Sequence, residues 1–263
     1  MGVATIIGIV VAVIGVLGGY VIEGGAIMSL FNIPGFMIVV VGTLGATITA
    51  FPLSSTLGIP GAFIRAMTGG GGAEPREMAE HLVEMADKAR REGLLSLEEE
   101  AQKVTEPFAR KGLMLMIDGT DPEALQSILE IDLEQEASRL KEQAEIWKVG
   151  SGFSPTLGVL GAVMGLITVL SGLGGDVAAL GHGIAVAFVA TFYGVGLANV
   201  LLLPVHMKLN AIAAEERQVR EMILEGTLSI QAGDNPRIVR EKLQGYLAPR
   251  QPPARRGRRG RWS

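Results

Sequence analysis

The side chains that could do chemistry are few and scattered along the chain. None of the 263 residues is cysteine, so a thiol nucleophile, a disulfide and a cysteine-based zinc or iron–sulfur site are excluded. The three histidines, His81, His182 and His206, are far apart and lack the spacing of metal ligands. Gly69–Gly72 lacks the Lys and Ser/Thr of a phosphate-binding loop. We therefore expect no enzyme, no metal and no cofactor.

Long stretches of the sequence carry no charge. Residues 2–22 and 24–64 contain no charged residue, and Asp176 is the only formal charge between Lys148 and Lys208. Ion carriers usually hold an ionisable group within the membrane, although a bare ion in hydrocarbon costs several kcal/mol. These apolar stretches supply no such group. Either this chain moves no ions, or another chain brings the carboxylate.

The uncharged stretches have the length of membrane helices. A helix rises about 1.5 Å per residue, so about 20 apolar residues cross the hydrocarbon core. A cleaved signal peptide fits the first stretch poorly, because no Lys or Arg precedes it. The pattern predicts four spans, near residues 3–22, 33–52, 152–172 and 180–205.

The basic residues predict the orientation of these spans. Residues 54–150 hold 11 Lys and Arg, residues 206–263 hold 12, and the short connectors hold none. The positive-inside rule then places both basic segments and both termini in the cytoplasm. We expect an all-α membrane protein with these segments: 1–53 with two spans, 54–150 as a cytoplasmic helical domain, 151–205 with two spans, and 206–263 as a cytoplasmic helix with a basic, disordered tail.

The 54–150 insert is expected to be helical throughout. Met78, Leu82, Met85 and Ala89 recur every three or four residues, as on one apolar helix face. The insert holds 19 acidic against 11 basic residues, so it is no nucleic-acid surface. Its helices are expected to begin at Pro75, at a capping box formed by Ser96 and Glu99, at Pro107 and at Asp121.

Small residues recur at four-residue spacing in the spans, a pattern that lets helix backbones approach closely. The pairs are Gly15/Gly19, Gly42/Ala46, Gly161/Gly165 and Ala190/Gly194.

The span hydroxyls are expected to bond to their own helix backbone. Pro155 and Pro204 lie at similar depth on consecutive spans, where they either mark helix ends or form a hinge.

Arg90 and Glu98 flank the turn between the first two helices of the insert. An arginine at a helix C-terminus and a glutamate at a helix N-terminus each offset the helix dipole. From the residues alone, this structural explanation is favoured over a contact with a partner.

Several stretches together resemble MotA-type flagellar stator subunits of the MotA/TolQ/ExbB family. They are GGYVIEGG at 18–25, ARREGLLSLEEE at 89–100, SPTLGVLGAVMGLI at 154–167 and AVAFVATFYGVGLANVLLLP at 185–204. The resemblance covers most of residues 1–245 and includes the order of spans and insert. It implies a chain in the bacterial inner membrane that forms a ring of five copies, a homopentamer, around a MotB-like, peptidoglycan-anchored subunit carrying the ion-binding Asp.

The resemblance also implies roles for particular residues. Arg90 and Glu98 match charges that contact the rotor protein FliG, and Pro155 and Pro204 match two prolines of conformational coupling. Thr191 matches a hydroxyl that faces the partner's Asp. In sodium-driven members a second Thr stands where this chain has Ala162, and sodium wants about six oxygen ligands. The resemblance therefore favours protons as the coupling ion.

Other functions remain as alternatives. A sodium-driven stator subunit is one, and an ExbB/TolQ-type energiser of outer-membrane processes is another, although such energisers usually have three spans. A solute carrier would show inverted repeats and broken helices with polar groups near the midplane, and the sequence shows no internal repeat and few such groups. A passive membrane scaffold is opposed chiefly by the family resemblance.

Overall fold

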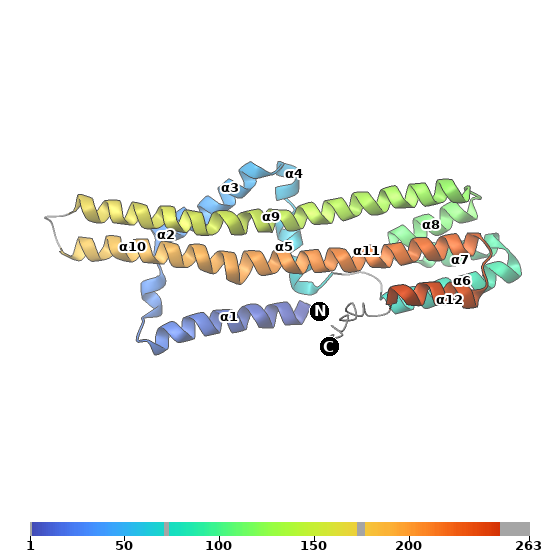
Figure 1. Cartoon of the computed structure of the whole chain (residues 1–263), viewed down its shortest axis with the longest axis horizontal. Helices are drawn as coiled ribbons and strands as arrows, with labels where there is room; N and C mark the ends of the chain where they lie inside the picture. The colour runs from blue at the N-terminus through green and yellow to red at the C-terminus, as the bar shows by residue number, and fades with distance from the viewer. Residues whose placement is uncertain (1, 71–73, 173–176, 248–263) are drawn as a thin grey trace, which may run out of the picture. The chain divides into compact units, whose positions relative to one another are not determined.

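The computed structural model describes residues 2–70, 74–172 and 177–247 (Figure 1). Within these ranges the chain forms helices joined by short turns and has no strand. Four helical segments of the described chain are long and apolar enough to cross a membrane, which confirms the predicted all-α fold with four spans. The predicted basic tail and most of the second connector lie outside the described residues. The candidate spans are Ala4–Ile22, Ile33–Ala50, and parts of Pro122–Ser171 and Gly183–Gln231.

The first two spans differ in regularity. Helix α1 (Gly2–Ile22) is uninterrupted, whereas the second span joins α2 (Ile33–Phe36), the π-helical turn η2 (Met37–Val41) and α3 (Gly42–Ala50). The side chain of Asn32 accepts a hydrogen bond from the backbone N–H of Gly35 at 2.8 Å and so caps α2. A short 3₁₀ turn, η1 (Ile27–Leu30), precedes this cap.

The third and fourth spans belong to much longer helices. Helix α9 (Pro122–Ser171) runs for 50 residues, so the helix that contains the third span begins far earlier than residue 152. It starts as predicted, because the carboxylate of Asp121 accepts from the N–H of Glu123 at 3.1 Å. The fourth span comprises α10 (Val177–Gly196) and the π-helical turn η4 (Leu197–Leu202), and α11 (Leu203–Gln231) follows directly.

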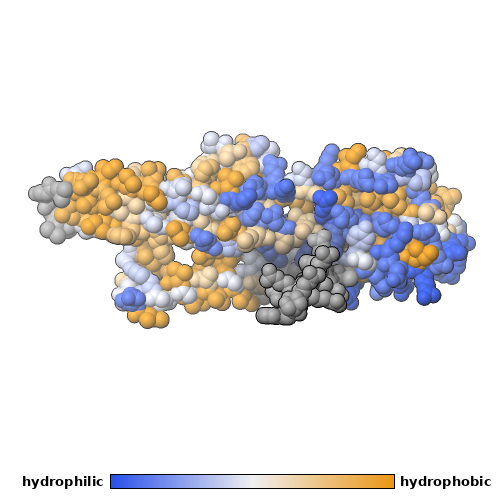
Figure 2. Space-filling model, in the orientation of Figure 1, coloured by the Kyte–Doolittle hydropathy of each residue, from blue (hydrophilic) through white to orange (hydrophobic). Residues whose placement is uncertain are grey.

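The chain divides into two compact units. Unit 1 contains Met1–Gly71 and Glu134–Glu216, and unit 2 contains Gly72–Leu133 and Arg217–Ser263. Unit 1 includes all the apolar spans, and Figure 2 shows hydrophobic colour over α1 and over the span portions of α9 and α10. Its side chains in α1 are largely exposed, among them Val11 at 62% and Ile14 at 64%. Apolar surface of this extent requires lipid or another protein chain to cover it.

Unit 2 is a helical bundle with its own core. It contains α6 (Pro75–Glu92), η3 (Leu94–Leu97), α7 (Glu98–Lys103), α8 (Pro107–Ile117) and α12 (Pro236–Leu247), with the adjoining parts of α9 and α11. The predicted face of α6 is confirmed, since Met78, Leu82 and Met85 are buried and Ala89 packs against the same core. At Gly226 of α11 an added Cβ would lie 2.8 Å from Leu82, so α11 approaches α6 closely.

The predicted capping box at Ser96 is wrong. The hydroxyl of Ser96 donates to the carbonyl oxygen of Gly93 at 2.7 Å and does not cap α7. Gly93 ends α6 with φ 86° and ψ 163°, a conformation that strongly favours glycine. Ser96 lies within the resulting 3₁₀ turn η3, and Leu97 takes the N-cap position of α7. Leu95, directly before Ser96, is 76% exposed and lies outside the bundle core.

Within unit 1, α9 and α10 lie side by side and touch through glycines (Figure 1). A Cβ built on Gly161 would stand 2.6 Å from the Cβ of Ala190, and one on Gly165 would stand 2.8 Å from the carbonyl oxygen of Gly183. A Cβ on Gly194 would lie 2.7 Å from the carbonyl oxygen of Ser154. Real Cβ atoms do not approach so closely, so the two backbones are in direct contact. We call this contact the glycine seam.

The other small-residue pairs behave differently. An added Cβ on Gly42 of α3 would meet Leu157 of α9 at 3.3 Å, which is a close contact within unit 1. Gly15 and Gly19 of α1 have no atom of the described chain within 4 Å of such a Cβ. The sequence pattern is the same in α1 and in the seam, and only the fold distinguishes them.

The seam predicts different effects for two glycines of the same helix. Gly165→Ala should separate α9 from α10, because its Cβ would meet backbone atoms of α10 at 2.8–2.9 Å. Gly152→Ala should be tolerated, since nothing lies within 4 Å and alanine favours a helix by about 1 kcal/mol. Thermal unfolding of the detergent-purified protein measures this difference. Equal midpoints for the two variants would contradict the seam.

Candidate functional site

Most hydroxyls in the spans bond to their own helix, as predicted. Thr47 donates to the carbonyl oxygen of Thr43, Thr168 to that of Met164, and Thr191 to that of Ala187 at 3.2 Å. Such bonds satisfy the hydroxyl in an apolar environment and hold its position relative to the helix axis. The hydroxyls of Ser154 and Tyr193 instead bond to other segments, and that of Thr43 has no partner.

Ser154 bonds across the seam. Its side chain is fully buried, and its hydroxyl on α9 donates to the carbonyl oxygen of Gly194 on α10 at 2.9 Å. Sequence reasoning assigned this residue no role beyond a bond to its own helix. Its spacing to Gly158, Gly161 and Gly165 is a signal that could have placed it on the seam.

Tyr193 of α10 holds the first connector. Its hydroxyl donates to the carbonyl oxygen of Leu30 and accepts from the backbone N–H of Asn32 at 3.3 Å. Its ring also meets that of Phe36 edge-on, with centroids 6.5 Å apart. This tyrosine therefore fixes the start of the second span against α10, close to Thr191.

Thr43 has a buried hydroxyl with no hydrogen-bond partner. Its usual acceptor, the carbonyl of residue 39, belongs to the π-helical turn η2, where the backbone bonds are shifted by one residue. An added Cβ on Gly150 of α9 would lie 3.3 Å from the hydroxyl oxygen of Thr47, one turn along the same face of α3.

Thr191 and Ala162 both lie on the helices of the seam. Thr191 is half-buried on α10, and its Cα would lie 3.3 Å from a Cβ added to Gly158. Ala162 is half-buried on α9, directly after seam residue Gly161. The fold thus brings the two candidate helices together, while the hydroxyl of Thr191 is occupied by its own helix.

The two prolines do not mark helix ends. Pro155 lies inside α9, and Pro204 lies in the helical run that continues from η4 into α11. Each proline lacks an N–H and removes a helical hydrogen bond. In η4 the backbone N–H of Leu203 reaches the carbonyl of Ala198, five residues back, so the helix is widened directly before Pro204. Both prolines therefore lie within continuous helices, at points where the backbone hydrogen bonding is irregular. The prediction that they mark helix ends is wrong.

Arg90 and Glu98 lie at the exposed end of unit 2, as the dipole argument requires. Arg90 is in the last turn of α6, and Glu98 is in the first turn of α7. Both are exposed, and no ion pair involves either one among the described residues. The neighbouring Lys88 donates a hydrogen bond to Glu100 at 2.7 Å, and this bond raises the pKa of Lys88. Both charges are thus available to a partner.

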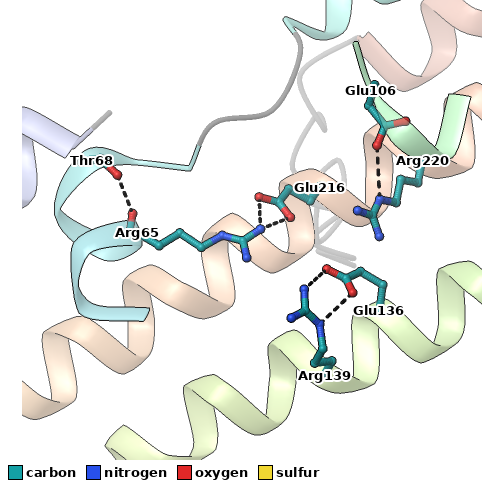
Figure 3. Close-up of polar contacts among 7 residues, drawn as sticks. All are labelled: Arg65, Thr68, Glu106, Glu136, Arg139, Glu216 and Arg220. Atoms are coloured by element: carbon teal, nitrogen blue, oxygen red, sulfur yellow. Dashed lines mark hydrogen bonds and ion pairs between the residues drawn. The ribbon is translucent and has the colours of Figure 1, made fainter. Parts of the chain in front are cut away.

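Paired charges border the apolar part of unit 1 (Figure 3). Arg65 of α5 (Ile59–Thr68) binds both carboxylate oxygens of Glu216 on α11. Arg139 of α9 pairs with Glu136 at 2.6 Å, and this hydrogen bond raises the pKa of Arg139 above its usual value. The Arg65–Glu216 pair ties the amphipathic helix α5 to α11, and both pairs lie outside the uncharged spans.

No metal site occurs in the described part of the chain. No group of three His, Asp or Glu side chains is close enough there to hold an ion. His206 is engaged otherwise, because its Nδ1 lies 2.8 Å from the carbonyl oxygen of Ala144 and must donate to it. The side chain of His182 lies outside what the structure describes.

Comparison with known proteins identifies relatives over most of the chain. Residues 6–93 match the family model "Motility protein A N-terminal", and residues 100–222 match the "MotA/TolQ/ExbB proton channel family". The chain is 40% identical to Motility protein A of Treponema phagedenis over 234 residues, which cover 89% of each protein. It is 43% identical to Motility protein A of Borreliella burgdorferi over 169 residues, which cover 64% of this chain and 65% of that relative.

A solved structure has the same fold. The structure of C. jejuni MotAB superposes with a TM-score of 0.89 and 32% identity, covering 96% of this chain and 98% of the other. The likeness therefore includes the long α9 and α10–α11 helices as well as the insert.

Proposed function

Because the chain belongs to the MotA/TolQ/ExbB proton channel family, we propose that it is the A subunit of a flagellar motor stator. With a MotB-like subunit it forms an ion channel that couples proton flow to torque on the rotor. The likeness to the C. jejuni MotAB complex over 96% of the chain carries this proposal. The chain is a multi-pass membrane protein. It acts as a channel subunit and not as an enzyme.

The composition of the spans supports the division of labour between the two subunits. The four spans contain no Asp, Glu, Lys or Arg, so the group that binds the ion comes from the partner. The exposed apolar surface of α1 and of the span helices supports assembly of several copies into a ring, for which we propose five. The ring lies in the bacterial inner membrane, with both termini, residues 54–150 and residues 206–263 in the cytoplasm.

Thr191 supplies the hydroxyl that faces the partner's Asp in this proposal. Thr191→Val keeps the shape of the side chain and removes the hydroxyl, so torque per assembled complex should fall about tenfold. Thr168→Val is the control, because Thr168 is an exposed hydroxyl on α9 that bonds only to its own helix. Rotation of tethered cells, together with co-purification of the partner, measures both variants. Undiminished rotation with Thr191→Val would refute the role.

Arg90 and Glu98 are the proposed contacts with FliG, the rotor protein. Reversing either charge should reduce torque and should be partly restored by charge reversals on the rotor. Glu241→Lys, on the exposed surface of α12, is a control that should leave torque unchanged. If each reversal instead lowered only the amount of folded protein, the charges would serve the helix ends alone.

The coupling ion is proposed to be the proton, because Ala162 stands where a sodium-driven subunit would need another oxygen ligand. Swimming should continue when sodium is removed and should stop when a protonophore is added. Loss of swimming on sodium removal alone would favour the sodium-driven alternative. If deleting this chain left swimming intact but impaired an outer-membrane process, the chain would instead be an ExbB/TolQ-type energiser.

A further inference from the structure

We propose that Ser154 is a positioning residue that fixes where Thr191 lies along the axis of the ion pathway. This inference rests on the proposed stator function and adds to it a residue that sets the register of α10 on α9. The observation behind it is the buried hydrogen bond from the hydroxyl of Ser154 to the carbonyl oxygen of Gly194.

The glycine seam needs such a bond because small residues do not resist sliding. Gly158, Gly161 and Gly165 present backbone to α10, with no side chain to interlock with the other helix. Packing of this kind is governed by non-directional dispersion forces, which change little when one smooth face moves along another. A hydrogen bond weakens steeply outside its normal length and angle, so the 2.9 Å bond of Ser154 fixes one position along the axis.

The bond lies next to the residues whose positions matter. Gly194 follows Thr191 by three residues, about 4.5 Å along a helix. Thr191 itself contacts the seam, since its Cα would lie 3.3 Å from a Cβ on Gly158. Fixing Gly194 against α9 therefore fixes Thr191 at nearly the same level.

The surrounding helices are weakened on both sides of this bond. Pro155 follows Ser154 directly and deprives α9 of one backbone hydrogen bond at this turn. On α10, the widened turn η4 begins three residues after Gly194 and leads to Pro204. The backbone of either helix can deform near these sites. The hydrogen bond from Ser154 to Gly194 then keeps the Thr191 region of α10 in register with α9 when Pro155 or Pro204 moves.

Other hydroxyls of the third span lack this geometry. Thr156, two residues further along α9, is exposed and donates to the carbonyl oxygen of Phe153 at 2.7 Å, within its own helix. Thr168 and Ser171 also bond within α9. Thr156 is thus a matched control, being a hydroxyl near the same proline without a bond across the seam.

The experiment replaces the chain in its native host with Ser154→Ala, Ser154→Cys or Thr156→Ala and measures torque per stator complex by bead rotation. A fluorescent partner subunit counts the complexes at each motor. Loss of one hydrogen bond between membrane helices changes a population ratio about threefold to about eighteenfold. We expect Ser154→Ala to lower torque per complex several-fold at an unchanged number of complexes. Ser154→Cys, a weaker donor, should be intermediate, and Thr156→Ala should equal the unmodified chain.

Two results would overturn the inference. One is normal torque per complex with Ser154→Ala. The other is a loss of torque in strict proportion to lost complexes, which would mean that Ser154 serves assembly alone. A deletion of the chain separates this failure from failure of the proposed function, because a deleted strain that still rotates its flagella would refute the stator assignment itself.

Discussion

Direct backbone contact between α9 and α10 is the constraint on which the rest of unit 1 depends. The contact exists because Gly158, Gly161, Gly165 and Gly194 have no Cβ at positions where one would collide with the other helix. In lipid, apolar side chains gain little by leaving the hydrocarbon for one another, so close backbone packing is a main source of helix association. The seam packs the helices that carry Thr191 and Ala162 against each other and allows the serine at its end to bond across it.

The polar groups of the spans are arranged around this contact. Most hydroxyls form their hydrogen bonds within their own helices and therefore make no hydrogen bond between helices. The hydroxyls of Ser154 and Tyr193 donate hydrogen bonds to other segments, the first to α10 and the second to the connector before α2. Both bonds end on α10, close to Thr191. The helix that carries the candidate ion-pathway hydroxyl is thus the helix that other segments hold in place.

The charged groups follow the opposite rule and lie beyond the apolar spans. Arg65 and Glu216 pair where α5 meets α11, and Arg139 pairs with Glu136 on α9. In unit 2, Arg90 and Glu98 stand exposed at the turn that Gly93 makes possible, where no described residue neutralises them by an ion pair. The separation matches the division of function proposed for the two units, with ion passage in one and contact with the rotor in the other.

The four spans, the helical insert and the apolar face of α6 could be predicted from the residues alone, because uncharged length and helical periodicity are local properties of a chain. The sequence also indicated the absence of ionisable groups from the spans, and the quoted stretches indicated the family. Which small-residue pairs pack depends on the three-dimensional fold, since Gly15/Gly19 and Gly161/Gly165 are alike in sequence and differ in what lies opposite them. The fold also places Pro155 within a continuous helix, the hydroxyl of Ser96 on Gly93, and the hydroxyl of Ser154 on the other helix of the seam. A hydroxyl takes whichever acceptor lies within about 3 Å, and that choice depends on neighbours distant in the sequence.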